Sequence, residues 1–414
     1  MLLQEQIAQV IDDQQEKFVR LPLGVSRDIL PQVPCIDHFA TIVTGIRRCG
    51  KSTLLLQILR QNFDRALFLN FEDIRLSAFE TADFTRLLNE IEKRKADVLF
   101  FDEIQTVSGW ETFIHQLLRD CFKVFVSGSN ASLLRTETAT HLTGRQVSVE
   151  LFPFSYSEFL QFKNLQASAK TFELYLKTGG MPEFVKTERQ IVLTSLADDI
   201  LIKDIAVRHS LKDTDSLRRL ALYLNTNIGR QVSANRLTNL FGIKSASTLL
   251  EYFSYLQDCY LFYFIPQFSY SLKTQIRNPK KIYTVDTGLS NALAFKVGED
   301  AGFLLENAVF LHLRRRYKEI YYFTETGECD FVVMEKAQPA RLIQVCYLLD
   351  DKNLDRELNG VRGAMKFFNK PNGTIVTFNQ TDRFETTDGT IDVVPACVFF
   401  AETVYAEITD NPAS

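Results

Sequence analysis

Gly45-Ile-Arg-Arg-Cys-Gly-Lys-Ser52 is the stretch that decides the fold of the N-terminal part of this chain. It fits the pattern G-x-x-x-x-G-K-[ST], in which a glycine-rich loop joins a strand to a helix and wraps phosphate groups with its backbone N–H groups. The apolar run Thr41–Thr44 predicts the strand, and Thr53–Arg60 predicts the helix. The chain is therefore expected to bind a nucleoside triphosphate.

Each constrained position of this loop has a chemical task. The two glycines let the backbone approach the phosphates, the Lys51 ammonium reaches the β- and γ-phosphates, and the Ser52 hydroxyl holds Mg²⁺. We expect ATP and Mg²⁺ as cofactors. The expected nucleotide-binding residues are Gly45, Arg47, Arg48, Cys49, Gly50, Lys51, Ser52 and Thr53.

A second segment supplies the carboxylates that an ATPase needs. Asp97–Glu103 is an apolar strand that ends in Asp102 and Glu103. Buried parallel strands are continuous apolar runs whose carboxyl ends face the ligand. We expect Asp102 to hold the Mg²⁺ coordination shell and Glu103 to orient the attacking water, because phosphoryl transfer depends on positioning and charge stabilisation. The alternative is a strand followed by a solvated acidic turn.

Two further polar positions fit catalysis. The strand that begins at Lys123 ends in Ser129 and Asn130, either of which could contact the γ-phosphate or the water, although Ser-Gly-Ser-Asn is also ordinary turn chemistry. Arg145 follows in Leu142-Thr-Gly-Arg145, and a guanidinium can stabilise transition-state charge in cis or from a neighbouring subunit. The alternative for Arg145 is a solvated surface charge. We predict Glu103, Lys51, Arg145 and Asn130 as catalytic residues.

Length and composition limit the remaining possibilities. At 414 residues the chain suits two or three domains, and its 46% hydrophobic and 24% charged content is that of a soluble globular protein. No apolar run approaches the ~18–20 residues of a membrane span, and no secretory signal is evident. The seven cysteines form no C-x-x-C pair, which disfavours zinc and a disulfide framework. A cytoplasmic protein is expected.

Positive charge gathers in the middle of the chain. Between Lys203 and Lys296 there are thirteen basic and six acidic residues, although the net charge of the whole chain is −4. Ser233–Phe241 and Thr248–Leu256 predict two helices, and Tyr260–Ile265 with Lys281–Val285 predicts a β-hairpin with a basic tip. This order predicts a winged helix, which could bind DNA; the alternative is a module that packs against protein.

The last domain carries an ambiguous set of polar residues. Glu306 lies in an apolar helix, Asp330 in a predicted strand, and Gln344 and Cys346 in a third, as in the layout of a PD-(D/E)-x-K nuclease site. That chemistry needs carboxylates for Mg²⁺ and a lysine beside the attacked phosphate. Here Cys346 stands at the lysine position, and Lys352 could substitute only if the chain folds back. We expect a degenerate second metal site at Glu306, Asp330 and Gln344, with little or no cleavage.

These motifs together resemble a family of prokaryotic AAA-type ATPases (AAA_14) with a C-terminal domain of unknown function. The resemblance rests on the loop at 45–52, Asp102-Glu-Ile-Gln105, Gly128-Ser-Asn130, Leu142-Thr-Gly-Arg145 and Pro153-Phe-Ser-Tyr-Ser-Glu-Phe159. It continues through Gly179-Gly-Met-Pro182, Lys203-Asp-Ile205, Pro279-Lys-Lys-Ile-Tyr283 and Asp286-Thr-Gly288. It implies an ATPase core, a winged helix and a nuclease-like fold.

We expect an α/β protein with four segments. A P-loop core over residues 1–153 is followed by a helical lid or connector at 154–202, a winged helix at 203–297 and a nuclease-like α+β domain at 298–414. One functional hypothesis is a homo-oligomeric ATPase that couples hydrolysis of Mg-ATP to DNA or other nucleic acid. The alternative is an ATP-gated switch that recruits a protein partner.

Overall fold

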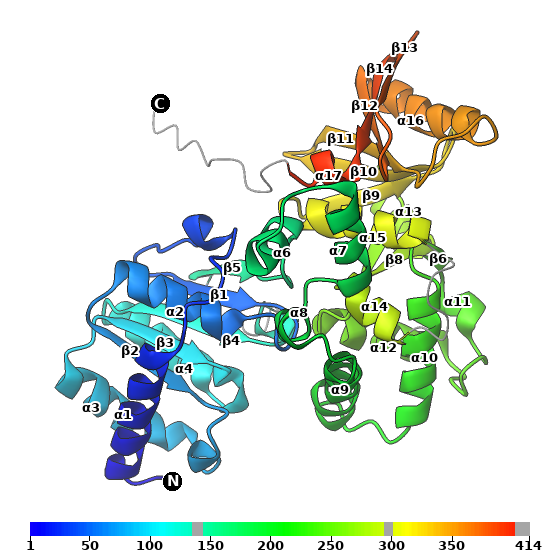
Figure 1. Cartoon of the computed structure of the whole chain (residues 1–414). Helices are drawn as coiled ribbons and strands as arrows, with labels where there is room; N and C mark the ends of the chain where they lie inside the picture. Colours follow the sequence, from blue (N-terminus) through cyan, green and yellow to red (C-terminus); the bar gives the residue numbers. More distant parts are fainter. Residues whose placement is uncertain (135–143, 294–300, 402–414) are drawn as a thin grey trace. The chain divides into compact units, whose positions relative to one another are not determined.

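The chain forms two compact units, Met1–Phe152 and Pro153–Ser414, which are described separately. The computed structural model describes residues 1–134, 144–293 and 301–401 (Figure 1). In these ranges no helix is long and apolar enough to cross a membrane.

The first unit is built on a five-stranded sheet in which every neighbouring pair is parallel. The strands are β1 (Ala40–Thr44), β2 (Ala66–Asn70), β3 (Val98–Asp102), β4 (Lys123–Gly128) and β5 (Gln146–Glu150), in the order β2-β3-β4-β1-β5. The apolar strands predicted before the glycine loop, before Asp102 and before Ser129 are confirmed. All five residues of β1 and of β3 are buried, as expected for strands covered on both faces. With helices around the parallel sheet, this is the α/β fold of a P-loop NTPase.

Helices cover the two faces of this sheet. They are α1 (Gln4–Arg20), α2 (Lys51–Asn62), α3 (Phe84–Arg94) and α4 (Trp110–Arg119), with short 3₁₀ turns at Leu30–Gln32, Ile74–Leu76, Thr81–Asp83, Ile104–Thr106 and Ala131–Leu134. One apolar core joins α1, α3 and α4 to Leu99 and Phe101 of β3. Phe100 points to the opposite face, since successive strand residues alternate, and lies 6.2 Å ring to ring from Phe63 after α2.

The N-terminal helix α1 lies along the edge strand β2 (Figure 1). The Gln15 side chain accepts from Phe68 N (3.0 Å) and donates to Ala66 O (2.6 Å). The Gln14 side chain does the same for Asn70 N (2.7 Å) and Asn70 O (3.1 Å). Two glutamines thus satisfy four backbone groups of the edge, which would otherwise offer pairing sites to another strand.

Helices open the second unit. They are α6 (Tyr156–Lys163), α7 (Ala169–Thr178), α8 (Pro182–Thr187), α9 (Ile191–Asp199), a π-helical continuation (Ile200–Val207) and α10 (Thr214–Thr226). The predicted break at Gly179–Pro182 is confirmed, because α7 ends at Thr178 and α8 begins at Pro182. Asp286 fixes this break by accepting from Gly180 N at 2.6 Å.

A small antiparallel sheet follows in the order β6-β8-β7. Its strands are β6 (Gln231–Val232), β7 (Phe262–Pro266) and β8 (Lys280–Thr284), with helices α11 (Ala234–Leu237), α12 (Ala246–Asp258), α13 (Leu272–Arg277) and α14 (Thr287–Leu293) around it. The pairing of β7 with β8 confirms the predicted hairpin.

Two details of that prediction are wrong. The first helix covers one turn, Ala234–Leu237, and not residues 233–241, because Thr238 after it leaves the helical conformation with ψ 136°. The supposed basic tip forms helix α13, which Ser271 caps by accepting from Thr274 N. Lys281 is not at a tip but buried, 2% exposed, in β8.

A mixed six-stranded sheet of order β13-β14-β12-β11-β10-β9 follows in the second unit. The strands are β9 (Glu319–Phe323), β10 (Cys329–Glu335), β11 (Gln338–Val345), β12 (Asn372–Thr377), β13 (Asp382–Thr386) and β14 (Gly389–Pro395), and the helices are α15 (Ala301–Arg314), α16 (Leu354–Phe368) and α17 (Ala396–Phe399). The sequence predicted three strands here: one before Asp330, one that carries Asp330 and one that carries Gln344. All three are confirmed, as β9, β10 and β11.

Candidate active site

The phosphate-binding loop between β1 and α2 depends on its two glycines. Gly45 has φ 147° and Gly50 has φ 102°, backbone angles that L side chains rarely adopt. A Cβ at Gly45 would also lie 2.1 Å from the carbonyl oxygen of Leu151, so no larger residue fits there. The loop therefore has the tight curvature that the sequence pattern requires.

Lys51 begins α2 and points its side chain back over the loop. Its ammonium donates to Gly45 O (3.1 Å) and Ile46 O (3.2 Å) and lies 3.8 Å from Glu103 Oε1. The residue is only 5% exposed. A cation is thus held above the loop, beside the second carboxylate of the β3 end.

Ser52 and Asp102 meet although fifty positions separate them. Ser52 Oγ donates to Asp102 Oδ2 at 2.7 Å, Asn70 Nδ2 donates to the same oxygen at 3.1 Å, and the Ser127 hydroxyl donates to Oδ1. Burial raises the pKa of Asp102, and the charge of Glu103 raises it further. A hydroxyl and a carboxylate at this spacing are the hard oxygen ligands that suit Mg²⁺.

Glu103 is held in place by the end of strand β4. Its Oε2 accepts from the backbone N–H and the hydroxyl of Ser129, both at 3.3 Å, and from the side-chain amide of Gln105. Its backbone has φ 54°, the left-handed region, which is uncommon for a glutamate. Asn130, the next residue after Ser129, is 1% exposed. The carboxylate and both predicted polar residues therefore share the same edge of the sheet.

The other predicted loop residues have separate environments. Arg47 forms an ion pair with Glu72 at 3.3 Å, Arg48 is exposed, and Cys49 is fully buried with its thiol donating to Leu151 O at 3.4 Å. Thr53 lines a cavity of about 540 Å³ beside the loop, which Ser52, Asp102, Asn70, Phe18 and Phe68 also line.

Asn70, Ser127 and Gln105 are the site residues that sequence reasoning missed. Asn70 and Ser127 lie at or near the carboxyl ends of β2 and β4, in register with Asp102 of β3. The signal that could have found Asn70 and Ser127 in the sequence is a polar residue at or near the end of an apolar strand.

Arg145 lies away from this group. Its carbonyl accepts from Ala40 N at 3.0 Å, which places it at the amino ends of β1 and β5, whereas the loop follows the carboxyl end of β1. Five strand residues separate the two ends, about 17 Å at ~3.3 Å per residue. That exceeds the length of an arginine side chain, so Arg145 cannot reach a nucleotide on its own loop. Leu142 and Thr143 of the same motif lie outside the described residues.

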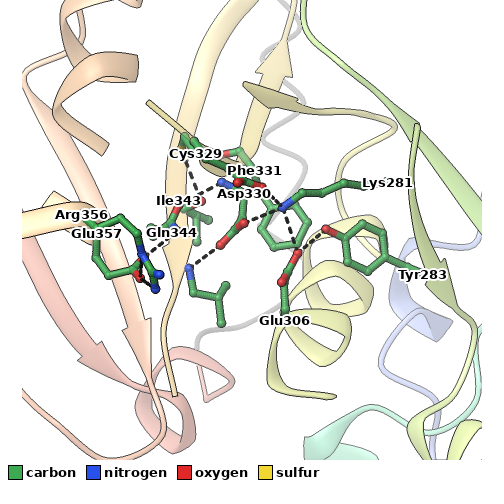
Figure 2. Close-up of polar contacts among 12 residues, drawn as sticks. Lys281, Tyr283, Glu306, Cys329, Asp330, Phe331, Ile343, Gln344, Arg356 and Glu357 are labelled. Atoms are coloured by element: carbon green, nitrogen blue, oxygen red, sulfur yellow. Dashed lines mark hydrogen bonds and ion pairs between the residues drawn. The ribbon is translucent and has the colours of Figure 1, made fainter. Parts of the chain in front are cut away.

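A second group of charged residues lies in the second unit and is centred on Lys281 (Figure 2). The Lys281 ammonium lies 2.7 Å from Asp330 Oδ1, 2.9 Å from Glu328 Oε1 and 3.3 Å from Glu306 Oε1. Tyr283 O–H donates to the same Glu306 oxygen at 2.6 Å. Strand β8, helix α15 and strand β10 thus contribute Lys281, Tyr283, Glu306 and Asp330 to one buried network, and the exposed Glu328 lies at its edge.

The charges in this network shift one another. Burial alone would lower the pKa of Lys281, but the carboxylates of Asp330 and Glu306 hold it well above its ordinary value. Burial, and then the charge of Asp330, raise the pKa of Glu306 to about 7, while Lys281 opposes this. A lysine ammonium therefore lies between the two carboxylates that were predicted to hold a metal.

The cation beside Glu306 and Asp330 is Lys281, which the sequence pattern did not single out for this group; Lys352 was the lysine considered there. Lys352 is exposed, and its backbone N–H donates to Asp350. Gln344 does approach Asp330, but its Oε1 accepts from Asp330 N (3.1 Å) and its Nε2 donates to Glu357 (2.7 Å). Within residues 1–134, 144–293 and 301–401, no three His, Cys, Asp or Glu side chains are placed to hold a metal.

Cys346 takes no part in holding a charge. Its thiol donates to Leu348 O at 3.1 Å, and burial raises the pKa of the thiol to about 11. The thiol therefore stays neutral near pH 7. Cys346, which stands at the lysine position of the predicted nuclease-like layout, thus supplies no positive charge there.

Comparison with known proteins agrees with the geometry of the first unit. The AAA domain family designated AAA_14 matches residues 37–160, and a domain of unknown function, DUF8612, matches residues 169–300. An uncharacterised protein of Methanocaldococcus jannaschii, MJ1544, is 31% identical over 383 residues, which cover 86% of this chain and 85% of that protein. The chain belongs to the same family. An uncharacterised protein of Haemophilus influenzae is 33% identical over 332 residues, 75% of this chain and 82% of that protein.

The solved structures that resemble this chain are more distant from it than these two relatives. A STAND-class signal transduction ATPase with a tetratricopeptide repeat sensor, PH0952 of Pyrococcus horikoshii, has 13% identity and a TM-score of 0.27 over 71% of this chain and 47% of that chain. The Rhizobiales Trip13 structure has 15% identity and a TM-score of 0.26 over 49% of this chain and 80% of that chain. Such TM-scores carry no argument about function.

Proposed function

We propose that this protein is an ATPase that binds and hydrolyses Mg-ATP in its first unit. The observation that carries the proposal is the 2.7 Å contact of the Ser52 hydroxyl with Asp102, beside Lys51 and Glu103. These four groups come from two separate sequence motifs and meet at one edge of the sheet. Hard oxygen ligands for Mg²⁺, a cation for phosphate and a carboxylate for water are the parts that phosphoryl transfer needs.

Each group has a proposed role. Backbone N–H groups of the loop and the Lys51 ammonium bind the β- and γ-phosphates, which would draw the ammonium away from the carbonyls of Gly45 and Ile46. Ser52 and Asp102 would hold Mg²⁺, which offsets the charge of the phosphates when bound. Glu103 orients the attacking water and accepts its proton, with Ser129 fixing the carboxylate and Asn130 contacting the γ-phosphate.

Arg145 would act between subunits. Because it lies a strand length from its own loop, a role in catalysis requires a neighbouring copy of the chain. A homo-oligomer in which Arg145 meets the neighbour's ATP is therefore part of the proposal. The guanidinium would stabilise the charge that develops on the transferred phosphoryl group.

The second unit would couple the nucleotide bound in the first unit either to nucleic acid or to a protein partner. The order α10, β6, α11, α12, β7, β8, with β8 between β6 and β7, supports a winged helix. Binding of DNA or other nucleic acid is supported by the exposed basic residues Lys273 and Arg277. Against it, the exposed face of α12, where a winged helix reads DNA, carries Leu250, Glu251, Ser254 and Gln257 and no basic residue.

The composition of that face favours the second hypothesis, an ATP-gated switch that recruits a protein partner. Leu250 is 56% exposed, and Ile276 of the neighbouring α13 is 67% exposed. Both line a cavity of about 690 Å³. A salt-titrated binding measurement with duplex and single-stranded DNA separates the two hypotheses, because phosphate contacts make affinity fall steeply with salt.

A nuclease-like fold for the C-terminal sheet is supported by the approach of Glu306, Asp330 and Gln344 to one another. Cleavage is not expected, since a lysine ammonium already neutralises the carboxylates that would hold the metal. A cytoplasmic location is supported by the seven cysteines, none of which is in a disulfide bond, as is usual in a reducing compartment.

Nucleotide titration tests the proposal for the first unit. Wild-type protein should bind ATP and ADP more tightly with Mg²⁺ than without it, and Asp102→Asn should lose most of the Mg²⁺ dependence. Lys51→Ala should lose tight binding, because the phosphate-binding cation is gone. Equal affinity of wild type and Lys51→Ala for ATP would reject the nucleotide site.

A further inference from the structure

We infer that Arg27 is a positioning residue of the phosphate-binding loop, which orients the Cys49–Gly50 peptide for contact with the nucleotide phosphates. The inference rests on the proposed ATP site and adds to it a residue from outside the loop and outside strand β3, whose end carries the two carboxylates. Arg27 precedes the loop by eighteen positions and belongs to the segment that links α1 to β1.

The Arg27 guanidinium bridges two backbone carbonyls of the first unit. Nη1 donates to Cys49 O at 2.9 Å, and Nη2 donates to Phe152 O at 2.6 Å. The residue is 2% exposed, although it carries a permanent charge. Burial of an arginine costs free energy unless its donors are satisfied, so a guanidinium kept here serves these carbonyls.

The bond to Cys49 O determines where the next N–H points. All described peptide bonds are trans, and in a trans peptide the C=O and N–H groups point in opposite directions. Because Arg27 holds the Cys49 carbonyl, the Gly50 N–H is directed to the opposite face of that peptide, away from the guanidinium, and we place the nucleotide phosphates on that face. Backbone N–H groups on that face are the donors that phosphates bind in such loops.

The bond to Phe152 O gives the guanidinium a rigid anchor. Leu151 N donates to Thr44 O at 2.7 Å, which continues the β1–β5 pairing up to the residue before Phe152. The loop itself leans on the same segment, since the Cys49 thiol donates to Leu151 O. Arg27 thus ties the Cys49–Gly50 peptide of the loop to the carboxyl end of the sheet.

The segment that carries Arg27 is itself fastened to α2. Gln57, which is 2% exposed, donates to Leu23 O (2.7 Å) and Val25 O (2.6 Å) and accepts from Arg27 N (3.3 Å). The position of the guanidinium relative to the loop is therefore set by backbone contacts and does not depend on a nucleotide.

Arg27→Met tests the inference in the full-length protein. Loss of the peptide orientation should raise the Kd for both ADP and ATP about 10-fold or more, because the affected N–H would bind a phosphate that both nucleotides carry. In steady state, KM should rise with little change in kcat, since this contact is the same in the ground and transition states. Arg27→Lys should fall between, because an ammonium keeps the charge and loses the planar fork.

Arg60→Met is the matched control. Arg60 also ties the N-terminal segment to α2, but it does so by donating to Phe18 O of α1 at 3.3 Å and not to a carbonyl of the loop. Its Kd and KM should equal the wild-type values, and urea unfolding of all variants without nucleotide gives the folded fraction.

The outcomes are distinct. Lower kcat with unchanged KM in Arg27→Met, in proportion to its unfolded fraction, would mean that Arg27 only supports folding and would overturn the inference. Wild-type Kd values in a folded Arg27→Met would overturn it as well. Failure of the wild type to bind ADP and ATP would instead reject the nucleotide site on which the inference rests.

Discussion

Replacing Lys281 by methionine removes the cation from a buried group of carboxylates. The side chains of Lys281, Glu306 and Asp330 are 3%, 10% and 6% exposed, and the ammonium lies 2.7 Å from the Asp330 carboxylate and 3.3 Å from that of Glu306. Breaking such a pair leaves uncompensated buried charge, which typically costs about 3–5 kcal/mol. That is a large fraction of the ~5–15 kcal/mol by which a domain is stable.

Urea unfolding followed by far-UV circular dichroism measures this loss. The transition of the second unit should move to lower urea in Lys281→Met. Lys280→Met, next to it in β8 and less buried, should change the free energy of unfolding by about 0.5 kcal/mol or less.

A double variant separates charge from packing. In Lys281→Met/Asp330→Asn one of the uncompensated charges is removed, so the combined loss should be smaller than the sum of the single losses by about 1–3 kcal/mol. A loss below about 1 kcal/mol in Lys281→Met, or strictly additive losses, would refute the view that this ammonium neutralises the carboxylates.

Three further predictions concern pH, cleavage and assembly. The pKa of Glu306 is raised from 4.5 in the unfolded state to about 7 in the folded state. Between these two pH values the folded state keeps a proton that the unfolded state has lost, so this group makes the free energy of unfolding fall as pH rises. The free energy of unfolding of Glu306→Gln relative to wild type should therefore increase from pH 4.5 to about 7, and a constant difference would contradict the shift. Labelled DNA and RNA should stay intact with Mg²⁺ or Mn²⁺, and cleavage that disappears in Asp330→Ala would show a working nuclease. Mixing Arg145→Ala with Glu103→Gln subunits should restore part of the ATPase activity, whereas a strictly monomeric protein with full activity would exclude a shared site.

The meeting of the candidate nucleotide-site residues was largely predictable because the parts of this site are local. A strand, a loop and a helix that follow one another in sequence place Lys51 and Ser52, and the end of an apolar strand places Asp102 and Glu103. Parallel strands bring their carboxyl ends to one edge, so the meeting of the two motifs follows from the fold class. Asn70 was not predicted, because an asparagine at the end of a short strand is equally typical of an ordinary turn.

The second cluster could not be predicted in the same way. Lys281 is separated from Glu306 by 25 positions and from Asp330 by 49, and the three residues come from different layers of the second unit. In sequence, Lys281 follows Lys280 and precedes an apolar strand, which is also the pattern of a solvated basic turn. Only the packing of β8 against α15 and β10 turns this lysine into a buried counter-charge. The location of Arg145 likewise depended on the strand pairing, which fixed its distance from the loop.

Hydrolysis of γ-labelled ATP by wild type and Glu103→Gln tests the central claim most directly. Both proteins should bind Mg-ATP with similar affinity, because Glu103 acts on the water and not on the phosphates. Wild type should release labelled phosphate, and Glu103→Gln should retain ATP with turnover reduced about 100-fold or more, the factor typical of a lost general base. Equal turnover in the two proteins would contradict the assignment of this carboxylate and of the ATPase site built around it.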